Sequence, residues 1–214
     1  MIDKIPKISF ILPTWNRAHY LADCLLSLQA QTLDDIEIIV IDDGSTDSTD
    51  MLCGYIHQND KRVKYHYIKH RGCGYARNYG NSLATGEIIA TADSDDVYHP
   101  SRATITYNYF QRNPEVDAFY GGYLQCDFWL QPQRRHIVEM AEEGHEDRFV
   151  HTMSAFRRKV FDKIKYPENR EYDVDTGMIE DLIKKGYAIG ITNKMLGKIR
   201  YSGEGLTAKR LKKC

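Results

Sequence analysis

The stretch IEIIVIDDGSTD, residues 36–47, joins six mainly apolar residues to a polar turn. A continuous apolar run of this length, closed by Asp, Gly and Ser, is typical of a strand that is buried on both faces. Comparable runs occupy residues 7–12 and 87–92, and Pro13 is expected to stop the first of them. A further strand is expected over residues 63–68. The first half of the chain therefore predicts four short strands.

The segments between these strands have helical spacing. Leu21, Leu25 and Leu28 share one face of a helix expected over residues 18–31, and further helices are expected over 51–57 and 76–86. Apolar strands that alternate with helices form a largely parallel sheet, covered on both faces and joined by right-handed crossovers. The sequence therefore predicts an α/β fold with a mostly parallel central sheet flanked by helices.

The second half of the chain is less regular. We expect a helix over residues 101–111, apolar segments over 117–130 and a charged stretch over 133–148. Because no internal repeat or linker-like run divides the two halves, they are expected to share one core.

Composition excludes several classes of protein. The 214 residues suffice for one compact domain, and a hydrophobic fraction of 42% excludes a disordered chain. A net charge of -1 provides no global positive field for nucleic acid. The five cysteines contain no CxxC pair, and the N-terminal apolar stretch is too short for a signal sequence or a membrane span. We expect a cytoplasmic protein without a transmembrane segment, and the basic end at Cys214 is compatible with a domain cut from a longer protein.

Polar clusters follow each of the four predicted strands. They are PTWNR at residues 13–17, DDGSTD at 42–47, RGCGYARN at 71–78 and DSDD at 93–96. Ligands of doubly wound sheets bind outside the carboxyl ends of the strands. The four clusters are therefore expected to line a single site.

The DSDD cluster places three carboxylates, Asp93, Asp95 and Asp96, within four residues. Such carboxylates repel one another unless a cation offsets their charge, and Mg²⁺ or Mn²⁺ is commonly held by one or two carboxylates plus substrate phosphates. The cluster predicts a divalent metal on a diphosphate. The alternative is a solvated acidic turn.

Two other clusters each have a functional and a structural interpretation. Asp42 and Asp43 can accept hydrogen bonds from a base or ribose, or they can form a helix-capping Asx turn. Arg71 and Arg77 lie beside glycines where a helix begins, which favours phosphate binding, but a plain surface loop is the alternative.

Taken in order, ISFILPTWNR, IIVIDDGSTD, GYARNYG and ADSDD resemble the family 2 glycosyltransferases, which are inverting enzymes of the GT-A fold. The resemblance covers nearly the first half of the chain. It implies a single Rossmann-like nucleotide-binding domain of GT-A type, in which residues 1–98 bind the nucleotide-sugar donor and residues 99–214 bind the acceptor and supply the catalytic base.

The same resemblance implies a set of site residues. Asp93 and Asp95 are the implied metal ligands, with Asp95 the first choice for direct ligation and Asp96 a helper. The residues implied to bind the donor are Pro13, Thr14, Arg17, Asp42, Asp43, Arg71, Arg77, Asp93, Ser94 and Arg200.

Two later segments complete the resemblance. EYDVDTGMIEDLIKKGYAIGI fits the family's outline around its catalytic carboxylate and implies Asp175 as the general base. Val174 replaces the usual Glu, which leaves Asp173 and the Glu180-Asp181 pair as competing assignments, and helix capping is the structural alternative for Asp175. KIRYSGEGLT retains the family's arginine as Arg200 but has Ser202 where a histidine is common. The histidines, His99 and His145 among them, are expected at the surface.

These observations predict a metal-dependent inverting glycosyltransferase that uses Mn²⁺ or Mg²⁺. It would move a sugar from a nucleotide-sugar, with UDP the expected nucleotide, to a glycan or glycoconjugate acceptor. Two alternatives stay open: a non-catalytic nucleotide-sugar-binding module, and a sugar-phosphate nucleotidyltransferase, although the glycine-rich signature of the latter is absent. Acceptor stacking and core packing are both open for the aromatic residues Tyr120, Tyr123, Phe128 and Trp129.

Overall fold

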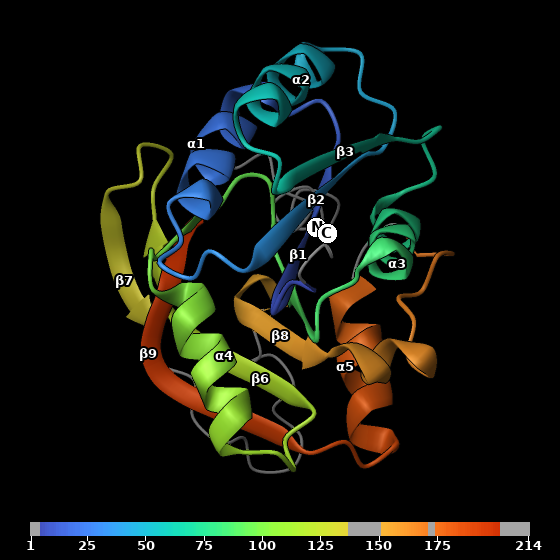
Figure 1. Cartoon of the computed structure of the whole chain (residues 1–214), viewed down its shortest axis with the longest axis vertical. Helices are drawn as coiled ribbons and strands as arrows, with labels where there is room; N and C mark the ends of the chain where they lie inside the picture. The colour runs from blue at the N-terminus through green and yellow to red at the C-terminus, as the bar shows by residue number, and fades with distance from the viewer. Residues whose placement is uncertain (1–4, 137–150, 171–173, 202–214) are drawn as a thin grey trace, which may run out of the picture.

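A computed structural model describes residues 5–136, 151–170 and 174–201. Its strands form one sheet in the order β3-β2-β1-β4-β8-β6-β9-β5, and β7 pairs with β6 (Figure 1). The strands are β1 (Ile8–Thr14), β2 (Ile36–Asp42), β3 (Val63–Tyr67), β4 (Ile88–Thr91), β5 (Val97–Tyr98), β6 (Ala118–Cys126), β7 (Pro132–His136), β8 (Ser154–Arg157) and β9 (Ile189–Arg200). The α/β fold predicted from the sequence is confirmed.

The two halves of the sheet differ in strand direction. β1, β2, β3 and β4 are all parallel, as the alternation of strands and helices predicted. β8 then runs antiparallel to both β4 and β6, while β6 and β9 are parallel to each other. The second half therefore extends the parallel sheet through an antiparallel strand.

Helices cover both faces of the sheet. The helices are α1 (Ala18–Gln29), α2 (Thr49–Asn59), α3 (Cys73–Leu83), α4 (Arg102–Arg112) and α5 (Val174–Lys184). Side chains of α1, α2 and α4 share one buried cluster with the sheet, whereas α3 and α5 contribute to two clusters on the other face. No helix in the described ranges combines the length and the apolarity needed to cross a membrane.

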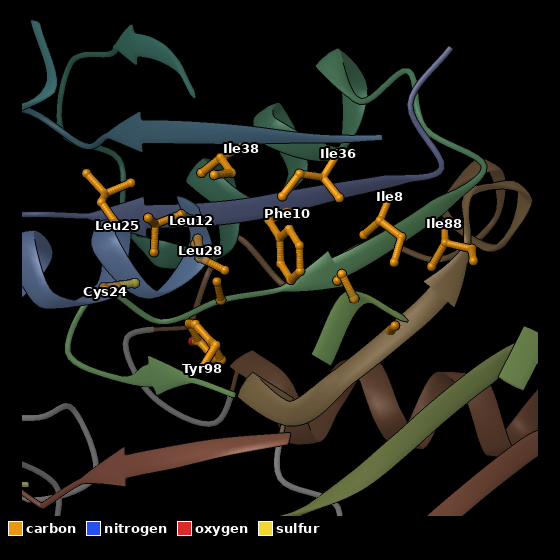
Figure 2. Close-up of a cluster of buried hydrophobic side chains, with 14 of the residues drawn as sticks. Ile8, Phe10, Leu12, Cys24, Leu25, Leu28, Ile36, Ile38, Ile88 and Tyr98 are labelled. Carbon is orange, nitrogen blue, oxygen red and sulfur yellow. The ribbon is translucent and has the colours of Figure 1, made fainter. Parts of the chain in front are cut away.

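Strand β1 is apolar at most of its positions because both of its faces are covered. Ile8, Phe10 and Leu12 belong to one buried cluster with Leu25 and Leu28 of α1 (Figure 2). The intervening residue Ile11 belongs to the cluster on the opposite face, with α3. Because successive side chains point to opposite faces, a strand covered on both sides buries apolar residues on each of them.

The expectation that Pro13 stops β1 is wrong. β1 continues through Pro13, which lies opposite Ile41, and ends at Thr14. The carbonyl of Ile11 accepts from Ala92 on the β4 side, so Pro13, two residues on, turns its backbone nitrogen to that side as well. The ladder to β4 ends at Thr91, so the missing N–H of Pro13 removes no ladder hydrogen bond.

A buried carboxylate joins three strands at the other end of the parallel sheet. Glu37 on β2 accepts hydrogen bonds from Ser9 Oγ at 2.5 Å, Lys64 Nζ at 2.7 Å and the backbone of Thr85 at 2.7 Å. Burial alone would raise the pKa of Glu37, but these hydrogen bonds outweigh it and the net pKa is lowered. The ionised form of Glu37 therefore stabilises the folded protein.

Candidate active site

The loops after β1 and β2 are fastened to each other at the carboxyl edge of the sheet. Asn16 donates its backbone N–H to Ser45 Oγ at 2.8 Å, and its side-chain carbonyl accepts from Thr46 at 2.7 Å. Asp47 accepts from Ala18 N at 3.0 Å and from Thr49 N at 3.1 Å, so one carboxylate caps the starts of α1 and α2. These contacts bring the first two polar clusters together, as predicted.

Asp42 and Asp43 are almost fully buried, and their carboxylates already have partners in the protein. Asp42 accepts from Ser45 N at 2.8 Å, which is the predicted Asx turn, and from the Tyr65 hydroxyl at 2.7 Å. Asp43 accepts from the backbone N–H groups of Arg71 and Gly72, each at 2.8 Å. The two aspartates therefore fix the conformation of the loop after β2 and its contact with the loop before α3.

The loop that carries Arg71 is shaped by its glycines. Gly72 is the N-cap of α3 and has a φ of 94°, a left-handed conformation that favours glycine. A Cβ atom on Gly74 would lie 2.2 Å from the carbonyl oxygen of Pro167, so this glycine allows a close approach of two backbone segments. The Arg71 side chain is largely exposed, stacks on Tyr75 and places Nη2 4.0 Å from Glu168 Oε2.

The acidic loop after β4 meets an arginine at each of two carboxylates. Arg17, at the start of α1, forms an ion pair with Asp95. Arg77, from α3, places Nη2 2.6 Å from Asp93 Oδ1. Because Arg17 and Arg77 arrive from different polar clusters, three of the four clusters converge on this loop.

Arg77 also reaches Asp175 at the start of α5. Its Nη1 forms an ion pair with Asp175 Oδ1, so one guanidinium bridges the acidic loop and the predicted base. The Arg77 side chain is 6% exposed, and that of Asp175 is 39% exposed. Burial opposes the charge of Arg77, but Asp175 and Asp93 raise the pKa of this arginine well above its usual value. Arg77 is therefore a fixed positive charge between two carboxylates.

Arg200, at the end of β9, also binds the acidic loop, through hydrogen bonds to two of its residues. Its backbone N–H donates to Asp96 Oδ1 at 3.0 Å, and its Nε donates to the backbone carbonyl of Asp95 at 3.0 Å. The remaining guanidinium nitrogens donate to Phe128 O at 2.7 Å and to Asp23 Oδ2 at 2.8 Å. Arg200 thus joins α1, the acidic loop and the turn before β7, and every guanidinium nitrogen has a protein partner.

Burial disfavours the charged forms of two carboxylates in the acidic loop. It raises the pKa of Asp95, although Arg17 opposes that shift, and it raises the pKa of Asp96 well above its usual value, with added repulsion from Asp95 and Asp93. No three His, Cys, Asp or Glu side chains of the described part of the chain are grouped to enclose a metal. A cation would favour the ionised carboxylates, whose hard oxygens fit a Mg²⁺ or Mn²⁺ ion that takes its remaining ligands from substrate phosphates and water.

The remaining predicted residues have simple positions. Pro13 and Thr14 end β1, and Ser94 lies within the acidic loop; all three are buried. Glu180 and Asp181, which competed with Asp175 as the base, are exposed on α5, and no described hydrogen bond or ion pair joins their side chains to the acidic loop. Asp173, Ser202 and His145 lie outside the described residues.

The aromatic residues of the second half divide between core and surface. Tyr120 is fully buried and packs edge-on against Phe156, which assigns it to the core. Trp129 is 75% exposed beside Phe128, so stacking on a sugar stays open for this pair. Tyr123 is partly buried and stacks on His136 with the ring centroids 4.5 Å apart.

The expected surface location is wrong for His151. This residue begins a 3-10 turn (His151–Met153), is 4% exposed, and lies with Nδ1 3.7 Å from Asp175 Oδ1. Burial and the nearby charge of Arg77 hold the pKa of His151 well below its usual value, so the ring is neutral. Its neighbours in sequence form no ligand spacing or catalytic motif, and only the packing of the second half brings it to the site.

Comparison with known proteins identifies the family to which the chain belongs. A sequence model described as glycosyl transferase family 2 matches residues 9–165. The chain is 28% identical over 191 residues to the glycosyltransferase GlyG of Streptococcus pneumoniae, covering 80% of this chain and 63% of GlyG. It is 39% identical over 213 residues to an uncharacterized glycosyltransferase of Rickettsia conorii, covering 92% of this chain and 33% of that protein. The chain therefore spans one to two thirds of the length of these relatives.

Solved structures show the same fold at low sequence identity. Residues 1–349 of S. aureus TarS in complex with UDP-GlcNAc align with a TM-score of 0.78 and 20% identity, covering 94% of this chain and 61% of that one. The mannosyltransferase PcManGT from Pyrobaculum calidifontis, in complex with GDP-Man and Mn²⁺, aligns with a TM-score of 0.71 and 20% identity, covering 99% and 61%. These likenesses support the fold alone.

Proposed function

The chain belongs to glycosyl transferase family 2, and from that premise we propose that it transfers a sugar, with inversion, from a nucleotide-sugar to a glycan or glycoconjugate acceptor. In this proposal residues 1–98 bind the donor, and residues 99–214 bind the acceptor and supply the base. The acidic loop would hold a divalent metal, Mn²⁺ or Mg²⁺, which would stabilise the departing nucleoside diphosphate.

The observation that carries this proposal is the position of Arg77 between Asp93 and Asp175. Sugar transfer needs a cationic site for the diphosphate next to a carboxylate that can receive a proton. Arg77 joins the acidic loop to the start of α5, so the two functions have neighbouring groups. A helix-capping role for Asp175 alone gives no reason for this buried arginine.

In the proposed reaction, Asp175 takes the proton of the acceptor hydroxyl as the oxygen attacks the anomeric carbon. The bond from that carbon to the diphosphate oxygen breaks, and the nucleoside diphosphate leaves with the electron pair. Arg77 and Arg17 offset the negative charge that develops on the departing group. Asp95 and Asp93 would hold a divalent metal, which would supply further charge neutralisation at the phosphates.

UDP is the proposed donor nucleotide. Among proteins of this fold, TarS has been solved with UDP and with UDP-GlcNAc, whereas PcManGT has been solved with GDP-Man. Proteins of this fold therefore bind more than one nucleotide. The experiment below distinguishes a UDP-sugar donor from a GDP-sugar donor.

The test is release of nucleoside diphosphate from a panel of UDP-sugars and GDP-Man, with Mn²⁺ or with EDTA, in the presence of mixed saccharide acceptors. The proposal expects release from one donor class that depends on Mn²⁺, and a product with inverted anomeric configuration by NMR. Donor binding without release under any condition would instead support a non-catalytic module. Pyrophosphate formation from a nucleoside triphosphate and a sugar phosphate would support a nucleotidyltransferase.

A further inference from the structure

His151 is a buried imidazole with one satisfied nitrogen. Its Nε2 lies 2.6 Å from the hydroxyl of Tyr166. Its Nδ1 has no hydrogen-bond partner among the described residues, and it is 3.7 Å from Asp175 Oδ1. A buried polar atom without a hydrogen-bond partner destabilises the folded protein, so a donor role towards the neighbouring carboxylate would account for Nδ1.

The contact with Tyr166 allows the imidazole to carry its proton on Nδ1. Burial raises the pKa of Tyr166 well above its usual value, so its hydroxyl remains protonated and can donate to Nε2. In a neutral imidazole, a nitrogen that accepts leaves the proton on the other nitrogen. When Tyr166 donates, Nδ1 of His151 carries an N–H on the side of Asp175.

The backbone around His151 is tied to the strand that leads into the acidic loop. The carbonyl of His151 accepts hydrogen bonds from Thr91, the last residue of β4, and from Ser154 Oγ at 2.5 Å. The ring packs edge-on against Tyr166 with the centroids 5.3 Å apart. His151 is therefore held in a fixed position relative to Asp93 and to the start of α5.

We propose that His151 is a positioning residue for Asp175: its Nδ1–H donates to the carboxylate, and Tyr166 fixes the tautomer that makes this possible. The inference rests on the proposed function in so far as Asp175 is the base. The gap of 3.7 Å is longer than a hydrogen bond, so the proposal requires a change of side-chain torsion in the 39% exposed Asp175 to bring the two groups together. The carboxylate is then aimed by a neutral donor as well as by Arg77.

The tautomer of His151 is measured by side-chain NMR of protein labelled with ¹⁵N-histidine. The expected spectrum of the wild type shows a neutral ring with the proton on Nδ1. Tyr166→Phe, which keeps the ring and removes only the donor, is expected to move the proton towards Nε2. Asp175→Ala should shift the Nδ1 signal, and Asp181→Ala on the same helix should leave it in place. A wild-type ring that carries its proton on Nε2 would overturn the proposal.

Steady-state kinetics provide the second readout. His151→Leu is expected to lower kcat by at least about tenfold, because a misplaced base loses catalysis steeply, while KM for the donor stays the same. His151→Asn, whose amide N–H can occupy the place of Nδ1, should recover a large part of that loss. Equal kcat values for wild type and the Leu variant would refute the role. If the wild type turns over no donor, the proposed function fails, whereas the NMR result still decides whether His151 donates to Asp175.

Discussion

Arg77 and Asp175 lie 98 residues apart in the chain and form an ion pair at the carboxyl edge of the sheet. The same guanidinium holds Asp93 at 2.6 Å. The acidic loop from the first half of the chain and helix α5 from the second half therefore meet through one buried side chain. This contact fixes the position of Asp175 relative to the acidic loop.

Asp175→Asn removes a proton acceptor and keeps the size of the side chain. We expect kcat to fall by about 10² to 10⁴, the usual contribution of a positioned general base, while UDP affinity is retained. The measurement is sugar transfer together with calorimetric UDP binding. Asp181→Asn, an exposed carboxylate on the same helix, is the matched control and should turn over normally. Normal turnover in Asp175→Asn would remove Asp175 from the mechanism.

Arg77→Met leaves Asp93 and Asp175 without their shared counter-charge. Removing one partner of a buried ion pair costs about 3–5 kcal/mol, and the partial exposure of Asp175 places the expected loss near the low end, at about 3 kcal/mol. Urea unfolding at neutral pH measures the free energy. Lys159→Ala, which breaks the exposed pair with Asp117, should change it by less than about 1 kcal/mol. Equal effects of the two substitutions would contradict the role given to Arg77.

Glu37 predicts a pH dependence of stability. Its pKa in the folded protein is lower than its ordinary value of 4.5, so the folded state binds the proton less tightly than the unfolded state. The stabilisation is fully present above about pH 4.5 and is lost as the pH falls through the lower, folded pKa. Glu37→Gln should therefore destabilise the protein at pH 7 and reduce the acid-induced loss of stability.

The free energy of unfolding in urea is measured for wild type and for Glu37→Gln at several pH values between pH 7 and pH 3. The free energies of wild type and Glu37→Gln should converge as the pH falls below 4.5. Parallel curves across this range would show that the charge of Glu37 has no net part in folding.

The sequence predicts the first half of the fold well because the signals there are local. Strands β1, β2 and β4 are short, mainly apolar runs followed by polar clusters, and leucines at helical spacing mark α1. The second half depends on pairing between distant segments. β6 lies between β8 and β9, parallel to one and antiparallel to the other, and no local pattern specifies that choice.

The sequence likewise predicts the part of the site that lies at the ends of the parallel strands, but not the part that depends on packing of the second half. Residues at the ends of β1, β2 and β4 were expected together, because parallel strands end at one edge. Asp175 was identified only by resemblance, since its meeting with Arg77 depends on the packing of α5. His151 could not be identified, because a single histidine beside apolar residues gives no periodic or ligand-spacing signal.

Calorimetry of UDP binding to wild type and Asp95→Ala, with and without Mn²⁺, tests whether the acidic loop holds the metal and the diphosphate. Asp34 is an exposed carboxylate before β2, at the opposite end of the strand, and Asp34→Ala serves as the control. We expect UDP binding that requires Mn²⁺ in wild type and Asp34→Ala, and that is lost in Asp95→Ala. Binding that is equally strong in all three proteins, or that is indifferent to Mn²⁺, would contradict the assignment of the acidic loop as the metal and diphosphate site.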